Sequence, residues 1–251
     1  MPAYERILGI NFFTGSAEEA AQIGARGGLV VVPSAPALME MQTNEQYREA
    51  ALNADLVITD SAYMVLLWFV MTGKKLQRVS GLKYLRILFE MGALRESVLW
   101  IMPNVAARDQ NLKWLKSQGY NFTEADCYLA PHYPEGPVLD EALLKMVNER
   151  KPKQIVVGLG GGTQEKIGMM LKRELQFKTG IHCIGGALGF VAGYQVNIPN
   201  WGDKFYLGWL FRCLSEPKKF VPRYWKSSKL APMMIRYREK LPDLLAPKSA
   251  A

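Results

Sequence analysis

The sequence predicts an α/β protein built on a doubly wound, mostly parallel sheet. Short β-branched or apolar runs alternate with helix-like stretches six or seven times along the 251 residues. The connections between them are short, which is typical of parallel strands joined by crossover helices. From residue 194 the alternation stops, and an aromatic, basic segment without strand signals follows. We therefore expect an α/β domain over 1–193 and a basic helical appendage over 194–251.

The first half of the chain is expected to supply three strands and four helices. Branched apolar runs predict the strands, at 7–10, 29–32 and 55–59. Ser16 and Thr43 each open a capping box, so helices should run from there to about residues 25 and 53. The apolar run 63–71 is too long for a strand and predicts a buried helix, and 82–91 is amphipathic.

The second half repeats this pattern. Branched apolar runs predict further strands, at 98–101, 125–129, 154–157 and 181–184. Asn104 is expected to cap a helix that ends at Gly119, and 139–147 should be helical after a proline-rich loop. Thr163 stands where the N-cap of a last helix belongs, just before a run with apolar residues at helical spacing.

Two of the predicted strands run directly into glycines. Backbone N–H groups and the positive end of a helix dipole then face any ligand, which is an arrangement that binds phosphate. The first junction is Gly158, Gly160, Gly161, Gly162 and Thr163, and the second is Gly185, Gly186 and Ala187, with Phe190 beyond. The first loop is neither a Walker A motif nor a clean dinucleotide fingerprint, so a tight turn that binds nothing stays the alternative.

Polar side chains near these strand ends have two interpretations each. Asp60 follows the strand at 55–59 and is either the N-cap of the next helix or a general base in the crevice. Gln164 and Glu165 either complement the helix dipole or contact a sugar or base beside a bound phosphate. Arg78 is a surface charge or a phosphate clamp. Ser34 follows another strand, and ligands of such sheets bind outside the carboxyl ends of the strands.

The positive charge is concentrated in the C-terminal appendage. Residues 194–251 hold 11 basic and four acidic residues, so they carry +7 of the net charge of +8. Such a segment is suited to an anionic partner such as nucleic acid, phospholipid or a diphosphate. Its cluster of Arg212, Lys218, Lys219 and Arg223 lies beside aromatic residues; an ordinary solvated helix face is the alternative.

The remaining composition argues against several classes of protein. The three cysteines are widely spaced and the two histidines do not form a ligand pattern, which argues against a disulfide framework or a metal centre. No signal peptide is evident, and the longest apolar run is about half the length of a membrane span. We therefore expect a reducing, cytoplasmic setting.

Taken in order, these pieces resemble the WecG/TagA/CpsF family of bacterial glycosyltransferases from about residue 7 to 225. The resemblance rests on the segments 54–60, 158–165, 185–193 and 209–212, on Glu216-Pro217, and on Arg78-Val79-Ser80-Gly81. It implies a Rossmann-like, GT-E-like fold and transfer of a sugar from a UDP-sugar to a polyprenyl-diphosphate-linked saccharide. Inversion at the anomeric carbon, no metal ion or other cofactor, and peripheral association with the inner face of the cell membrane are also implied.

The resemblance also implies roles for particular residues. Asp60 matches the family's proposed base, and Gln164 matches the glutamine of its loop. The basic cluster at 212–223 matches residues taken to bind diphosphate and anionic membrane. The remaining donor-site positions are expected at Ser34, Arg78, Ser80, Gly81, the two glycine junctions, Glu165 and Phe190.

Several positions depart from the family pattern around the expected donor pocket. The family's Pro-Lys before the loop glutamine is Gly162-Thr163 here, its second-motif aspartate is Gly189, its Thr-x-Asn is Val32-Pro33-Ser34, and an arginine is Asn197. These departures motivate a second hypothesis, a catalytically silent homologue that binds nucleotide sugar or a partner glycosyltransferase. A nucleic-acid-binding protein ranks low, because no reading element is recognisable. The apolar run 63–71 is a candidate contact for a homo-oligomer.

Overall fold

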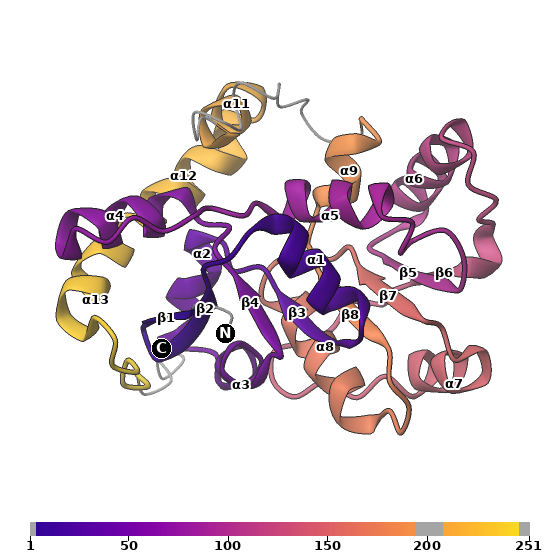
Figure 1. Cartoon of the computed structure of the whole chain (residues 1–251), viewed down its shortest axis with the longest axis horizontal. Helices are drawn as coiled ribbons and strands as arrows, with labels where there is room; N and C mark the ends of the chain where they lie inside the picture. Colours follow the sequence, from indigo (N-terminus) through magenta and orange to yellow (C-terminus); the bar gives the residue numbers. More distant parts are fainter. Residues whose placement is uncertain (1–3, 194–207, 246–251) are drawn as a thin grey trace.

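The computed structural model describes residues 4–193 and 208–245. Within them, eight strands form one sheet in the order β1-β2-β4-β3-β8-β7-β5-β6 (Figure 1). The strands are β1 Tyr4–Ile7, β2 Ile10–Phe13, β3 Gly28–Val31, β4 Leu56–Ile58, β5 Val98–Met102, β6 Cys127–Leu129, β7 Gln154–Val157 and β8 Gly180–Cys183. The β1–β2 pair is antiparallel and the other six pairs are parallel, which confirms the predicted fold class.

Helices lie between the strands and cover both faces of the sheet (Figure 1). They are α1 Ala17–Ala25, α2 Ala35–Leu38, α3 Glu45–Asn53, α4 Ala62–Thr72, α5 Gly81–Glu90, α6 Val105–Ser117, α7 Glu141–Arg150, α8 Thr163–Glu174, α9 Ala187–Val191, α11 Gly208–Ser215, α12 Pro217–Ser227 and α13 Leu230–Tyr237. Two 3₁₀ turns, Met39–Gln42 and Glu124–Asp126, complete the set.

The prediction of one strand at 7–10 is wrong, because Leu8 and Gly9 form the turn of a hairpin between β1 and β2. Both residues have positive φ, 52° and 80°, as a two-residue turn between antiparallel strands requires. The C-terminal segment holds this turn: Leu8 N donates to Arg238 O at 2.7 Å and Gly9 N to Glu239 O at 3.1 Å. A leucine at positive φ is not readable from local sequence, because L side chains rarely adopt it.

Most predicted helix starts are confirmed, and three caps move by one residue. The capping box of Ser16 and Glu19 is present, and Asn104 accepts from Ala107 N at 2.9 Å. The other caps are Asn44 in place of Thr43, Ser61 in place of Asp60, and Gly162 in place of Thr163. In each case the residue next to the expected cap has the extended or positive-φ backbone that a cap requires.

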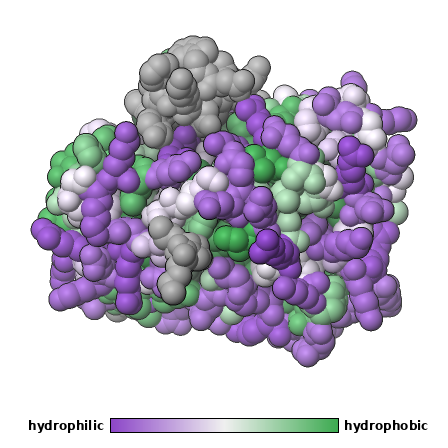
Figure 2. All heavy atoms as spheres, in the orientation of Figure 1, coloured by the Kyte–Doolittle hydropathy of each residue, from purple (hydrophilic) through white to green (hydrophobic). Residues whose placement is uncertain are grey.

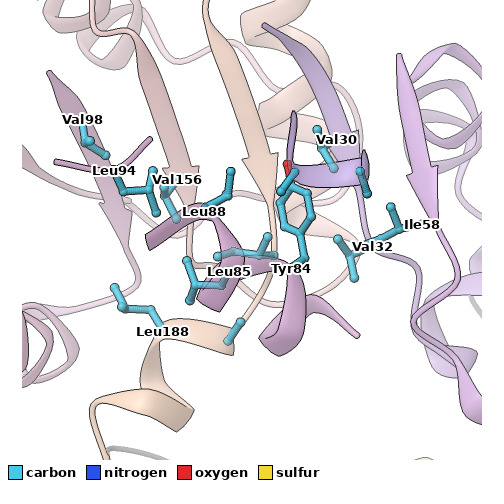
Figure 3. Close-up of a cluster of buried hydrophobic side chains, with 14 of the residues drawn as sticks. Val30, Val32, Ile58, Tyr84, Leu85, Leu88, Leu94, Val98, Val156 and Leu188 are labelled. Atoms are coloured by element: carbon cyan, nitrogen blue, oxygen red, sulfur yellow. The ribbon is translucent and has the colours of Figure 1, made fainter. Parts of the chain in front are cut away.

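Three apolar clusters hold the layers together. One lies on the face covered by α1, α5 and α9, where Tyr84, Leu85 and Leu188 pack on strand residues such as Val30 and Val156 (Figure 3). A second fills the opposite face under α7 and α8. The third joins the β1–β2 hairpin to α4 and α13. The sheet is therefore buried on both sides, and its strand ends are the exposed edge.

The C-terminal segment divides into two parts. Leu230, Met233 and Met234 of α13 are buried in the cluster with Ile7 and Trp68, and Leu245 N donates to Gln42 O at 2.8 Å. Residues 230–245 thus pack back on the body, while α11 and α12 extend above it (Figure 1). The boundary at residue 193 stays a prediction, and we expect a truncation there to uncover this core.

In the part of the chain that the structure describes, no helix combines the length and apolar character needed to cross a bilayer.

Candidate active site

The features singled out in the sequence meet at one edge of the sheet. β4, β3, β8 and β7 are consecutive and parallel, so their carboxyl ends lie side by side. Asp60 follows β4, Ser34 follows β3, Gly185 follows β8 and Gly158 follows β7. The crevice between elements at such an edge is where ligands of doubly wound sheets bind. The structure therefore brings the predicted site residues of the α/β domain to one place.

Asp60 is partly exposed at this edge and is not a helix cap. Ser61 caps α4 by accepting from Met64 N at 3.2 Å, which leaves the Asp60 carboxylate available. Asp60 Oδ1 accepts from Gly81 N, the first N–H of α5, at 3.1 Å. Among the described residues, none hydrogen-bonds to Asp60 Oδ2. One carboxylate oxygen is thus fixed by a helix N-terminus, and the other can take a proton from a ligand.

Arg78 is held against the backbone of Asp60. Its Nε donates to Asp60 O at 2.8 Å, and its Nη2 lies 4.0 Å from Asp60 Oδ1. The side chain is 15% exposed, which argues against the alternative of a simple surface charge. The guanidinium is therefore held at the same edge of the sheet as the Asp60 carboxylate.

Ser80 and Gly81 form the start of α5 rather than an isolated turn. Ser80 is buried and caps the helix by accepting from Lys83 N at 3.2 Å. A Cβ at Gly81 would lie 3.2 Å from Val32 Cγ1 and 3.6 Å from Ile184 O. The N-terminus of α5 therefore meets the ends of β3 and β8, where a side chain larger than that of glycine would need Val32 to shift slightly.

The first glycine loop leads into the N-terminus of α8. Gly160 and Gly161 are exposed, and the space around a Cβ at Gly160 is open. Gly162 is the N-cap, with φ of 90°, and a Cβ there would meet the Glu40 carboxylate at 2.7 Å. Thr163 is the first residue of α8. The loop thus presents exposed backbone at the site, and one residue later it has a positive φ that glycine adopts without strain.

Gln164 and Glu165 lie below this loop and do not face solvent. Gln164 Oε1 accepts from Gly185 N, and Gln164 Nε2 donates to Glu165 Oε1 at 2.8 Å. Glu165 Oε2 accepts from Gly162 N at 2.7 Å. These bonds join the two glycine junctions through two side chains. Burial raises the pKa of the Glu165 carboxyl to about 7, and the nearby Glu40 also raises it.

The second glycine junction lines a small pocket. Gly185, with φ of 60°, and Gly186 lead into the five-residue helix α9, where Ala187 is buried and Phe190 is partly exposed. The pocket lies between this junction, Gly158 and α6. Its volume of about 40 Å³ is room for a few waters. A nucleotide therefore needs side chains to move before it can enter.

Two side chains in this region were missed from the sequence. Glu40 lies against Gly162, and Asn111 lines the pocket from α6. No local signal marks Glu40. Asn111 was detectable, because it shares the buried face of α6 with Ala107 and Leu115, where an apolar residue belongs.

The structure describes Ser34 but only one side chain of the basic cluster. Ser34 begins α2 without a capping bond from its hydroxyl and is partly exposed at the end of β3. Lys218 is exposed on α12. The side chains of Arg212, Lys219 and Arg223 lie outside the described residues, as do the departure at Asn197 and its neighbours. The diphosphate role of this cluster stays a prediction.

The buried histidine belongs to the fold. Burial lowers the pKa of His182 to about 3, so its ring is neutral. Its Nε2 donates to Gln154 Oε1 at 2.7 Å, because the amide NH₂ of Gln154 is committed to Ala25 O. Its Nδ1 accepts from Tyr84 OH at 2.8 Å. Within residues 4–193 and 208–245, no three His, Cys, Asp or Glu side chains are grouped so as to hold a metal ion.

Comparison with known proteins agrees with this arrangement. The model of the glycosyl transferase WecG/TagA/CpsF family matches residues 5–243. Similar proteins include enzymes of Staphylococcus aureus strains MRSA252 and MW2, each named N-acetylglucosaminyldiphosphoundecaprenol N-acetyl-beta-D-mannosaminyltransferase. Each is 21% identical over 193 residues, covering 76% of this chain and 74% of the relative.

Proposed function

Because this chain belongs to the WecG/TagA/CpsF family of glycosyl transferases, we propose that it moves a sugar from a UDP-sugar to a polyprenyl-diphosphate-linked saccharide. The observation that carries the proposal is the Asp60 carboxylate. It is partly exposed at the strand edge, with one oxygen bonded to Gly81 N and the other without a bond from any described residue. A base for an acceptor hydroxyl needs such a position.

The proposed reaction is a single displacement that inverts the anomeric carbon. The acceptor oxygen forms a bond to that carbon, Asp60 takes the hydroxyl proton, and the bond to the diphosphate oxygen breaks. The ring passes through an oxocarbenium-like state, as in other glycosyl transfers. Negative charge develops on the leaving diphosphate. We propose that the backbone N–H groups of Gly160 and Gly161, the N-terminus of α8 and the Arg78 guanidinium stabilise it, without a metal ion.

The names of the relatives support the acceptor and the type of donor. They describe enzymes that act on N-acetylglucosaminyl-diphosphoundecaprenol and transfer N-acetylmannosamine. We therefore propose a lipid-linked amino-sugar acceptor, a hexosyl or N-acetylhexosaminyl donor, and a role in cell-envelope or exopolysaccharide synthesis. The departures at Gly162, Thr163 and Gly189 lie around the donor loops, so the donor sugar need not be that of the relatives.

An acceptor of this kind stays in the membrane, so the enzyme has to approach it there. Large apolar side chains are exposed on α4 and α12: Leu66, Phe69, Val70, Val221 and Trp225. Figure 2 shows such side chains gathered at the left edge of the molecule, over α4. Lys74 and Lys226 flank them, and basic residues beside aromatic ones suit an anionic headgroup layer. We propose peripheral association of this surface with the inner face of the membrane.

The function is tested first by nucleotide-sugar binding and then by transfer. A panel of UDP-sugars is screened for protection against thermal unfolding, and the best donor is incubated with a polyprenyl-diphosphate-linked N-acetylglucosamine. Formation of a lipid-linked disaccharide is the expected result. Absence of protection by every UDP-sugar contradicts the donor class. If anionic liposomes fail to sediment the protein at low salt, where the electrostatic attraction is largest, the membrane role is wrong.

A silent homologue is the second candidate, and the departures at Gly162, Thr163 and Gly189 around the donor loops favour it. In that case UDP binds and no acceptor of the lipid-linked class is glycosylated. The two candidates thus differ in turnover and not in binding.

A further inference from the structure

Asn111 is a polar side chain in a place built for an apolar one. It lies on the inner face of α6 between Ala107 and Leu115 and is 5% exposed. Its Nδ2 donates to Met102 Sδ at 3.3 Å, and no residue within 4–193 or 208–245 hydrogen-bonds to its Oδ1. A buried carbonyl without a partner destabilises a fold, and a leucine of similar size would avoid the loss. The fold alone gives no reason for an amide here.

The orientation of the amide is fixed by its neighbour. A thioether sulfur accepts hydrogen bonds and donates none, so the NH₂ group belongs on the Met102 side. The carbonyl oxygen is then the half of the amide that is left to a ligand. It can accept hydrogen bonds and cannot donate one.

The surroundings of Asn111 fit a flat ring. Besides Asn111, the pocket wall includes the apolar residues Met102, Pro103 and Ala107 and the glycines 158, 185 and 186. Glycines leave backbone planes without side chains, and the other residues are apolar. An apolar slot with one fixed polar group is the usual form of a site for a small heterocycle.

The position of the pocket identifies which part of a ligand it receives. Gly158 and Gly185 belong to the two loops on which we place the donor diphosphate. In the sheet order, Asp60 follows β4 and the pocket lies farther along, at the ends of β8 and β7. A group bound in the pocket is therefore the nucleoside end of the donor, on the side of the diphosphate away from Asp60. We infer that Asn111 Oδ1 accepts a hydrogen bond from the N3–H of uracil and selects uridine nucleotides; this rests on the proposed function. Cytosine has a lone pair at N3, which would face the carbonyl oxygen and be repelled.

The test compares UDP, CDP and 3-methyl-UDP by calorimetry on the whole chain. The wild type should bind UDP on the order of tenfold more tightly than CDP or 3-methyl-UDP, since each lacks the N3–H. Asn111→Leu should bind UDP about tenfold more weakly than the wild type and lose the preference over CDP. Its unfolding temperature should equal or exceed that of the wild type. Gln110→Leu, an exposed neighbour on the same helix, should change neither.

Each outcome has one meaning. If Asn111→Leu keeps the preference for UDP, or if the wild type binds 3-methyl-UDP as well as UDP, the inference is wrong and the proposed function stands. If the wild type binds no uridine nucleotide, the donor proposal fails, and the inference fails with it. Asn111→Ala replaces the leucine variant if that one does not fold, and the 3-methyl-UDP comparison needs no variant.

Discussion

The two sides of the crevice use carboxylates in opposite ways. On the glycine side, Glu165 is completely buried, and its two oxygens accept from Gly162 N and Gln164 Nε2. On the other side, Asp60 is partly exposed and has one oxygen bonded to Gly81 N. A carboxylate with both oxygens bonded holds backbone in place, and one with an oxygen that no described residue bonds can exchange a proton with a ligand. Position in the fold, and not residue type, separates the two roles.

The backbone conformations of the two sides of the crevice also differ. The glycine side depends on conformations that other residues rarely adopt, with positive φ at Gly162 and Gly185. The Asp60 side has ordinary backbone, joined by side-chain bonds such as Thr59 Oγ1 to Gln77 O at 2.6 Å. We therefore expect substitutions on the glycine side to change stability and binding, and those at Asp60 to change turnover.

The largest expected effect is on turnover at Asp60. Asp60→Asn keeps an oxygen to accept from Gly81 N but removes the basicity, so kcat should fall on the order of a hundredfold or more with little change in stability. The matched control is Asp55→Asn at the other end of β4, where the carboxylate accepts from Leu29 N at 2.7 Å and pairs with Lys172. Kinetics of transfer to a lipid-linked acceptor measure both. Full activity of the Asp60→Asn variant would contradict the assignment of Asp60 as the base.

Adjacent glycines should separate stability from binding. Gly162→Ala places a side chain at positive φ and near the Glu40 carboxylate, so the free energy of unfolding should fall by about 1–3 kcal/mol from the backbone alone. At Gly161 a Cβ meets only Ala37, at 3.7 Å, and the residue is exposed. Gly161→Leu should therefore fold normally and lose UDP binding by steric block. Denaturant unfolding and calorimetry distinguish the two; UDP binding by Gly161→Leu at wild-type affinity contradicts the diphosphate position.

The titration of Glu165 should make stability depend on pH. Its folded pKa of about 7 lies above its ordinary 4.5, so the folded state holds the proton more tightly. Stability from this group is complete below pH 4.5 and is lost as pH rises to about 7, at about 1.4 kcal/mol per pKa unit. Glu165→Gln cannot ionise, so its free energy of unfolding should rise relative to the wild type across this range. Glu90→Gln, an exposed change on α5, is the control. Parallel pH profiles for wild type and Glu165→Gln would contradict the assignment.

The sequence predicted the sheet and the gathering of the candidate site residues at one of its edges, because both depend on local patterns. Branched runs, caps and glycine junctions are short-range signals, and parallel strands bring their carboxyl ends together whatever the details. The turn at Leu8 was missed because residues 238 and 239, far along the chain, hold it. The burial of Glu165 was not predicted for the same reason, because it depends on packing of α8 against α3 and the sheet. Contacts between distant segments cannot be predicted from local sequence patterns.

The smallest expected effect is that of a chelator. It tests the roles that we give to both sides of the crevice, the glycine side and the Asp60 side. If the glycine N–H groups, the N-terminus of α8 and Arg78 stabilise the leaving diphosphate, then EDTA should leave transfer unchanged. A divalent ion at this edge would need oxygen ligands, and Asp60 is the carboxylate placed to give one. Loss of activity in EDTA, with recovery in magnesium or manganese, would therefore indicate that Asp60 is a metal ligand and not a base. In that case Asp60→Asn should lower metal affinity together with turnover, whereas a pure base changes turnover alone. Measuring activity of both proteins against metal concentration decides between these roles.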